Sequence, residues 1–407
     1  MDYGFLLDLA LILLSTKVLG LITRRFHMPQ VVGALLAGLI LGPALLGWLK
    51  ETTYISDSAE IGVVVLMFCA GIETDVHELK KAGKASFVIA LLGVITPLLG
   101  GFAIAYIYNN INGIESDATS PILLQNIFIG IVLTATSVSI TVETLKELGK
   151  LNTAAGNAIL GAAVIDDFLG IIALTIITSV ADPRVNIYIV LAKIVGFFIF
   201  AAIFGYLFHL FYLEMSRHTD RARKRHAITA FVFCLLMSYA SERFFGVADI
   251  TGAYIAGLVV SVSSLKKYLS FRFDILSSLY LSPIFFASIG IQVTLPQMNS
   301  SIVIFAIILT IIAILSKVIG CGLGAKLMKY SSKESLQIGV GMISRGEVAL
   351  IVASKGASLG LVSSQLISPI IIVVVITTII TPILLKPVFS NKSPTDDFSS
   401  SNTDLSY

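Results

Sequence analysis

Long apolar segments separated by short polar connections run through almost the whole of this 407-residue sequence. Hydropathy distinguishes about thirteen of them, and most approach the roughly 20 residues that a helix needs to cross a bilayer. Stretches of about ten residues with alternating polarity do not recur, so the strands of a membrane barrel are not expected. We therefore predict an all-α polytopic membrane protein whose segments cover approximately residues 4–22, 29–48, 58–73, 85–108, 121–145, 152–180, 187–213, 226–244, 248–264, 273–291, 300–327, 335–355 and 365–388.

The composition agrees with this class and excludes several others. Hydrophobic residues make up 56% of the chain and charged residues 13%, whereas soluble domains carry about 25% charged residues. The net charge of +3 indicates no nucleic-acid partner. Cys69, Cys234 and Cys321 lie far apart in apolar segments, without the spacing of a metal site or a disulfide framework. Because no nucleophile–base arrangement is recognisable either, we expect neither an enzyme nor a bound cofactor.

The positions of the basic residues predict the topology. Lys and Arg gather in alternate connections, such as those near residues 80–84, 146–150, 217–225 and 326–333, while the connections between them hold few. The positive-inside rule makes the basic side cytoplasmic. Thirteen crossings then place the N-terminus outside and the C-terminus in the cytoplasm. Residues 389–407 are rich in Ser and Asp and are predicted to form a disordered cytoplasmic tail.

Two adjacent carboxylates, Asp166 and Asp167, interrupt the otherwise apolar run of residues 154–179. A charge at mid-membrane costs at least ~2.5–3.5 kcal/mol on insertion scales, so such residues are candidates for function. Successive side chains on a helix point about 100° apart. One aspartate can therefore face a partner helix while the other faces an aqueous cavity.

Three further apolar segments carry unexpected polar residues. Small hydroxyl residues fill the stretch from Thr134 to Thr141 and favour a local break in the helix. Lys317 lies too deep in its segment to reach the interface easily, so we expect it to pair with a carboxylate. In Ser344-Arg345-Gly346-Glu347, a glycine between opposite charges indicates a second interrupted helix, although a structural ion pair is an alternative.

The order of these features indicates an internal repeat. A possible break precedes the aspartate pair in the first half, and Lys317 precedes a second possible break in the other half. With thirteen helices, the two broken segments run in opposite directions through the bilayer. This predicts inverted repeats with two crossed discontinuous helices, whose half-helix dipoles face an ion site near the midplane.

Nearly the whole chain resembles the second branch of the monovalent cation–proton antiporters. This group contains the NapA sodium–proton antiporters and the membrane parts of the KefB and KefC potassium efflux systems. The resemblance rests on five motifs in order: Gly71-Ile72-Glu73-Thr74-Asp75, Thr134-Ala135-Thr136-Ser137, Asp166-Asp167, Ser316-Lys317 and Gly341-Met342-Ile343-Ser344-Arg345-Gly346-Glu347.

The resemblance implies a homodimer in which an ion-carrying core moves past a dimer scaffold and exposes its site to each side in turn. We expect a bacterial inner membrane protein. The implied division is 1–80 and 226–291 for the scaffold, 84–180 and 300–388 for the core, and 187–213 for a linker helix, followed by the tail at 389–407.

The chemistry of the expected site follows from its oxygen atoms. Dehydrated Na⁺ prefers hard oxygen ligands, which Asp167, Thr134 and Thr136 can supply. Protons and Na⁺ compete for the same carboxylate, and this competition couples their transport. Asp166 is predicted to pair with Lys317, which releases a proton when the pair opens; two protons per Na⁺ make exchange electrogenic. Arg345 and Glu347 are assigned to stabilising the crossed breaks.

The residues leave the ion and the mode of transport open. A K⁺/H⁺ antiporter is the nearest alternative, as is a KefC-like K⁺ efflux system, here expected without the cytoplasmic nucleotide-binding domain of the Kef systems. A channel-like K⁺ pore would move ions without a counter-proton. A non-transporting membrane subunit would gain nothing from the charges at Asp166, Asp167 and Lys317.

Overall fold

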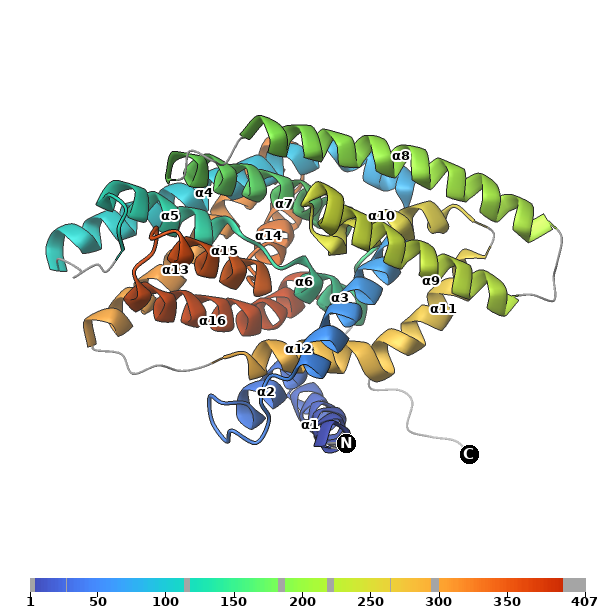
Figure 1. The fold of residues 1–407 in the computed structure, drawn as a ribbon, viewed down its shortest axis with the longest axis horizontal. Helices are drawn as coiled ribbons and strands as arrows, with labels where there is room; N and C mark the ends of the chain where they lie inside the picture. Colours follow the sequence, from blue (N-terminus) through green and yellow to red (C-terminus); the bar gives the residue numbers. More distant parts are fainter. Residues whose placement is uncertain are drawn as a thin grey trace, which may run out of the picture.

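The computed structural model describes residues 4–26, 28–112, 118–181, 187–217, 223–263, 265–293 and 300–390, and within them the regular secondary structure is entirely helical (Figure 1). The first half contains α1 (Gly4–Arg25), α2 (Gln30–Leu41), α3 (Thr53–Glu73), α4 (Val76–Asn112), α5 (Ile122–Thr134), α6 (Val138–Glu147), α7 (Ala154–Ala181) and α8 (Ile187–Arg217). The second half contains α9 (Arg223–Ala240), η2 (Ser241–Phe245), α10 (Asp249–Ser261), α11 (Lys266–Leu276), η3 (Ser277–Leu281), α12 (Ser282–Ile291), α13 (Ser300–Leu327), α14 (Ser332–Gly341), α15 (Glu347–Ser358) and α16 (Ser364–Phe389).

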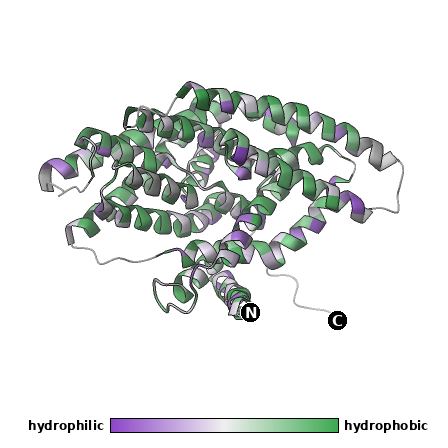
Figure 2. Cartoon of the chain, in the orientation of Figure 1, coloured by the Kyte–Doolittle hydropathy of each residue, from purple (hydrophilic) through white to green (hydrophobic). Residues whose placement is uncertain are grey.

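Every predicted apolar segment contains helix. In the described residues, ten helical stretches are long and apolar enough to cross a membrane, and α2 and α10 are shorter apolar helices. Hydrophobic residues predominate along the long helices, including α8 at the edge of the molecule (Figure 2). Leu6, Leu14, Tyr206 and Phe211 are among many large apolar side chains that face outward, as expected where lipid is the solvent. The chain is a multi-pass membrane protein, while the count of thirteen crossings stays a prediction.

Several helix bounds differ from the sequence prediction. Helix α4 begins at Val76 rather than near residue 85, because its polar first turns continue the helix beyond the apolar stretch. The segment predicted at 273–291 begins earlier, at Lys266, and passes through the π-helical segment η3. A second π-helical segment, η2, ends α9 at the left-handed Gly246. From residue 391 onward, the predicted tail lies outside the described residues.

The two broken helices occur where the sequence indicates them. Helix α5 ends at Thr134 and α6 begins at Val138, while α14 ends at Gly341 and α15 begins at Glu347. The Ser137 backbone N–H donates to the Ser344 carbonyl at 2.8 Å, and the Ser344 hydroxyl donates to the Ser137 carbonyl at 2.5 Å. The two breaks therefore cross each other and satisfy each other's backbone groups, as membrane burial requires.

Packing around the breaks repeats within the chain. Helix α4 packs against α5 and α7 in the first half, and α13 packs against α14 and α16 in the second. Helices α4 and α13 also share the most extensive contact in the structure. The remaining helices pack mainly among themselves, through α1 with α2, α2 with α12, and α3 with α10.

Candidate ion-binding site

Asp166 and Asp167 lie midway along α7, a helix formed by a nearly unbroken run of apolar residues. Asp166 is only 2% exposed, whereas Asp167 is half-buried. This difference follows from the angle of about 100° between successive side chains on a helix. Asp166 therefore faces the packed interior, and Asp167 belongs to a separate environment one step around the helix.

Asp166 is satisfied by three hydrogen bonds from two other helical segments. Lys317 on α13 donates from Nζ to Oδ1 at 2.9 Å and to Oδ2 at 3.1 Å. Thr136, in the break between α5 and α6, donates from Oγ1 to Oδ2 at 2.7 Å. Lys317 has an exposed fraction of 0%, so each charge of the pair compensates the other in a medium that solvates neither.

Helix α4 approaches this ion pair closely because Gly93 has no side chain. A Cβ built on Gly93 would lie 3.8 Å from both Asp166 Oδ1 and Lys317 Nζ, and only 2.5 Å from Cys321 Sγ. One turn along, the Thr96 hydroxyl donates to the Ser316 carbonyl at 2.9 Å, next to Lys317. Helix α4 thus holds α13 in the position that brings Lys317 to Asp166. The sequence analysis did not identify Gly93 or Thr96, since an isolated Gly or Thr in an apolar helix has no distinctive pattern.

Asp167 lines a cavity of about 80 Å³ beside the break between α5 and α6. Thr134, Thr136 and Asp166 line the same cavity, together with Ala248 before α10 and Val348 on α15. This volume can hold a cation with a few water molecules. Thr134 donates its hydroxyl hydrogen to the Ile131 carbonyl at 2.7 Å, so its oxygen can serve only as an acceptor. The cavity therefore offers carboxylate and hydroxyl oxygens, the ligands that a hard cation prefers.

Arg345 lies in the second break and is buried, with 1% of its surface exposed. Its guanidinium donates to the carbonyls of Ile343 at 2.8 Å, Leu133 at 2.7 Å and Ala313 at 3.1 Å. Leu133 belongs to the last turn of α5, where carbonyls have lost their helical partners and the helix dipole is negative. Arg345 thus joins the end of α5 to α13 and to its own break.

The structure brings together most of the residues selected from the sequence. Asp166, Asp167, Thr134 and Thr136 share one cavity, Lys317 binds Asp166, and Arg345 bonds to the end of the helix that carries Thr134. The side chain of Glu347 lies outside the described part of the structure, so its assigned role stays a prediction. Among the described residues, no group of three or more His, Cys, Asp or Glu could form a metal centre. Any bound ion must depend on one or two carboxylates and neutral oxygens.

Comparison with known proteins identifies relatives along the whole chain. Residues 10–391 match the family described as "Sodium/hydrogen exchanger, transmembrane". The "Probable Na(+)/H(+) antiporter GerT" of Bacillus cereus is 41% identical over 95% of this chain and 99% of its own length. The "Na(+)/H(+)-K(+) antiporter GerN" of the same organism is 38% identical over 96% and 98%.

A solved structure shares the fold. The sodium proton antiporter MjNhaP1 from Methanocaldococcus jannaschii superposes with a TM-score of 0.66, covering 93% of this chain and 95% of its own, at 20% identity. At that identity the likeness concerns the fold alone.

Proposed function

The chain belongs to the sodium/hydrogen exchanger family, and from this premise we propose that it exchanges Na⁺ or Li⁺ for H⁺ across the membrane. Its close relative GerT is named a probable Na⁺/H⁺ antiporter and matches almost end to end. The observation that carries the proposal is the small cavity in which Asp167 meets Thr134 and Thr136 beside a helix break. A transporter of this kind is not an enzyme, and its ions are cargo.

Asp167 is the residue that carries the cation and the competing proton. Its carboxylate lines the cavity, whereas the neighbouring Asp166 is already occupied by Lys317 and Thr136. A carboxylate in a low-dielectric site must be neutralised by either a proton or a cation. The site therefore crosses the membrane loaded with one or the other, which links the two fluxes.

The Asp166–Lys317 pair supplies the second proton in this proposal. When Na⁺ enters, Asp166 turns toward the ion and leaves Lys317 without a counter-charge. A buried ammonium that has lost its partner releases its proton readily. Two protons would then exchange for each Na⁺, and the transport would be electrogenic.

The movement is an elevator step of one helix group past another. The ion-carrying core comprises residues 84–180 and 300–388, the scaffold 1–80 and 226–291, and residues 187–213 form the linker helix. One buried apolar cluster, which includes Phe128, Phe305 and Val373, draws its members only from core helices and the short loop that follows α15. The core would therefore travel as a unit, in a homodimer held by the scaffold. The boundary between residues 80 and 84 falls within the first turns of α4.

The orientation in the membrane is inferred from the basic residues of the connections. The ends of α6 and α13, which carry Lys146 and Lys326, would face the cytoplasm. The N-terminus then lies outside and the C-terminus inside, in a bacterial inner membrane.

Potassium is the second candidate for the transported cation. The relative GerN carries both Na⁺ and K⁺ in its name and is nearly as similar as GerT. Carboxylate and hydroxyl oxygens bind either ion, and the side chains named here fix no ionic radius.

The proposal is tested by proton flux in proteoliposomes with an imposed pH gradient. Na⁺, Li⁺, K⁺ and Rb⁺ are added in turn to the wild type, to Asp167→Asn, and to Asp57→Asn as a matched control on the exposed face of α3. We expect Na⁺ and Li⁺ to dissipate the gradient in the wild type and in Asp57→Asn, but not in Asp167→Asn. Equal or faster dissipation by K⁺ and Rb⁺ would move the substrate to potassium. Failure of every cation would overturn the antiporter.

A further inference from the structure

The end of α6 makes polar contacts with three helices of the proposed scaffold. Lys146 forms a hydrogen-bonded ion pair with Asp274 on α11, and its Nζ lies 3.8 Å from Glu73 Oε1 at the end of α3. Glu147, the next residue, accepts hydrogen bonds from the Gln30 backbone N–H at 2.8 and 3.1 Å. Gln30 opens α2, where a carboxylate also complements the positive end of the helix dipole. We refer to these contacts of Lys146 and Glu147 as the α6 tether.

The scaffold side of the tether is held by its own hydrogen bonds. Ser270 on α11 donates to Glu73 Oε1 at 3.3 Å, and Lys266 donates to the carbonyls of Glu73 and Thr74, both at 3.3 Å. These bonds join the end of α3 to α11, so the acceptors for Lys146 form one unit. The tether consequently connects two bodies rather than two independent side chains.

The cavities show that the ion site communicates with only one side of the interface. The site cavity shares Ala248 and Val348 with a cavity of about 480 Å³ formed between α9, α10 and α15. A cavity of about 430 Å³ lies on the α6 side, where Gln30, Glu143 and Glu147 line it. In the described residues, this second cavity has no lining residue in common with the site cavity.

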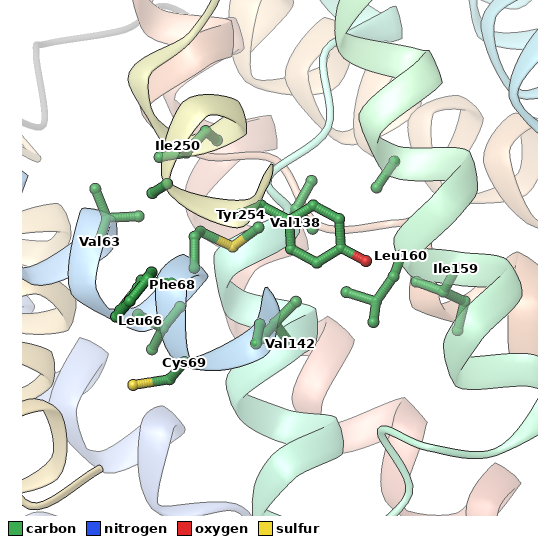
Figure 3. Packing of buried hydrophobic residues seen from close by; sticks show 14 of the residues in the cluster. Val63, Leu66, Phe68, Cys69, Val138, Val142, Ile159, Leu160, Ile250 and Tyr254 are labelled. Atoms are coloured by element: carbon green, nitrogen blue, oxygen red, sulfur yellow. The ribbon is translucent and has the colours of Figure 1, made fainter. Parts of the chain in front are cut away.

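Apolar packing separates the site from the α6 side. Val138 and Val142 of α6 pack with Leu160 of α7, Phe68 of α3 and Tyr254 of α10 in one buried cluster (Figure 3). All five are buried, and the figure shows them converging between the helices. The tether thus lies at the end of the interface that is closed, and the open cavity lies at the other end.

We propose that the α6 tether is a lock that holds the carrier in the state whose site opens beside α10 and α15, and that it must break before the site can open toward α6. This inference rests on the proposed elevator function. Any movement of α6 past α2, α3 and α11 would separate Lys146 from Glu73 and Asp274. Loss of the tether therefore shifts the population toward the state open on the α6 side.

The test measures solvent access to two positions, so it does not depend on transport. A parent protein has its three cysteines, which are buried and unpaired, replaced by alanine. A single reporter is added by Val142→Cys on the closed side or Val348→Cys in the open cavity. The protein is placed in nanodiscs, where both faces are accessible, and is labelled with a charged, water-soluble thiosulfonate. Each reporter is compared in the parent and with Lys146→Met, Lys146→Arg or Lys326→Met, Lys326 being a lysine that bonds only within the core, to Ser332.

We expect Lys146→Met to raise the labelling rate at Val142→Cys by about two- to fivefold, the range for loss of partly exposed ion pairs. The rate at Val348→Cys should not rise, and Lys146→Arg and Lys326→Met should keep parental rates. An unchanged rate at Val142→Cys would overturn the lock. Equal acceleration at both reporters would also overturn it, because that result indicates general loosening. If the lock is supported while proteoliposomes exchange no cation, the proposed function fails and the lock does not.

Discussion

Lys317 and Asp166 form a salt bridge across 151 residues of sequence, with Lys317 Nζ 2.9 Å from Asp166 Oδ1 and both side chains buried. Two opposite charges placed in contact largely offset the cost of removing each from water. A third group, the Thr136 hydroxyl, bonds to the same carboxylate from the break in the neighbouring helix. The ion pair therefore joins α7, α13 and the crossing point of the broken helices.

Removing one partner of this pair should destabilise the protein strongly. Lys317→Met leaves Asp166 as an uncompensated buried charge, which typically costs about 3–5 kcal/mol. The double variant Asp166→Asn with Lys317→Met removes both charges and should recover much of that loss. Thermal unfolding in detergent measures both effects. A double variant no more stable than Lys317→Met would show that the charge imbalance is not the cause.

The same lysine should determine the coupling of exchange to the membrane potential. Without Lys317 only the Asp167 proton remains for exchange, so residual Na⁺/H⁺ exchange by Lys317→Met should become electroneutral. Transport in proteoliposomes whose potential is clamped by K⁺ and valinomycin should respond to voltage in the wild type and not in the variant. Equal voltage dependence in both would exclude Lys317 as the source of the second proton.

Arg345 should be important for stability because three carbonyls depend on its guanidinium. Arg345→Met leaves the carbonyls of Ile343, Leu133 and Ala313 without this donor, and each buried unsatisfied group costs about 1–3 kcal/mol. The variant should unfold at a clearly lower temperature, with Arg345→Lys intermediate because an ammonium can still reach some of these oxygens. Unfolding of Arg345→Met at the wild-type temperature would contradict this account of the second break.

The contact between α4 and α13 should be sensitive to a single methyl group. At Gly320 a Cβ would lie 1.9 Å from Thr96 Oγ1 and 2.6 Å from the Leu92 carbonyl, so Gly320→Ala must push the helices apart. Such overpacking usually costs about 1–3 kcal/mol. Gly322 is the matched control, since the nearest atom to its Cβ is the Ser335 carbonyl at 3.4 Å. We expect thermal stability to fall for Gly320→Ala and to stay near wild type for Gly322→Ala; similar behaviour of the two would contradict the packing argument.

Much of this architecture could be predicted from local sequence signals. Small hydroxyl residues at Thr134–Ser137 and a glycine between charges at Ser344–Glu347 disfavour continuous helix, and both helices are broken there. Lys317 lies deep in an apolar segment where only a carboxylate could satisfy it, and it contacts Asp166. These predictions succeed because burial in a membrane leaves a charged or unpaired group very few alternatives.

Other features depend on three-dimensional contacts that no local pattern reveals. Lys146 meets Asp274 across 128 residues, and nothing in the cytoplasmic cluster of charges indicates that pairing. The hydroxyl hydrogen of Thr134 goes to its own helix, at Ile131, because that carbonyl is always within reach. The π-helical segments η2 and η3 also have no sequence signature comparable to a proline or a glycine pair.

The central claim is that Na⁺ and H⁺ compete for Asp167, and proton release from the purified protein tests it most directly. Na⁺ is added to wild-type protein in weakly buffered detergent solution while a pH indicator records the protons set free. We predict that Na⁺ releases protons from the wild type and that Asp167→Asn releases fewer, losing the proton that Asp167 holds, while Asp57→Asn behaves as the wild type. Undiminished, Na⁺-dependent proton release from Asp167→Asn would contradict the account, because the shared site would then have to lie elsewhere.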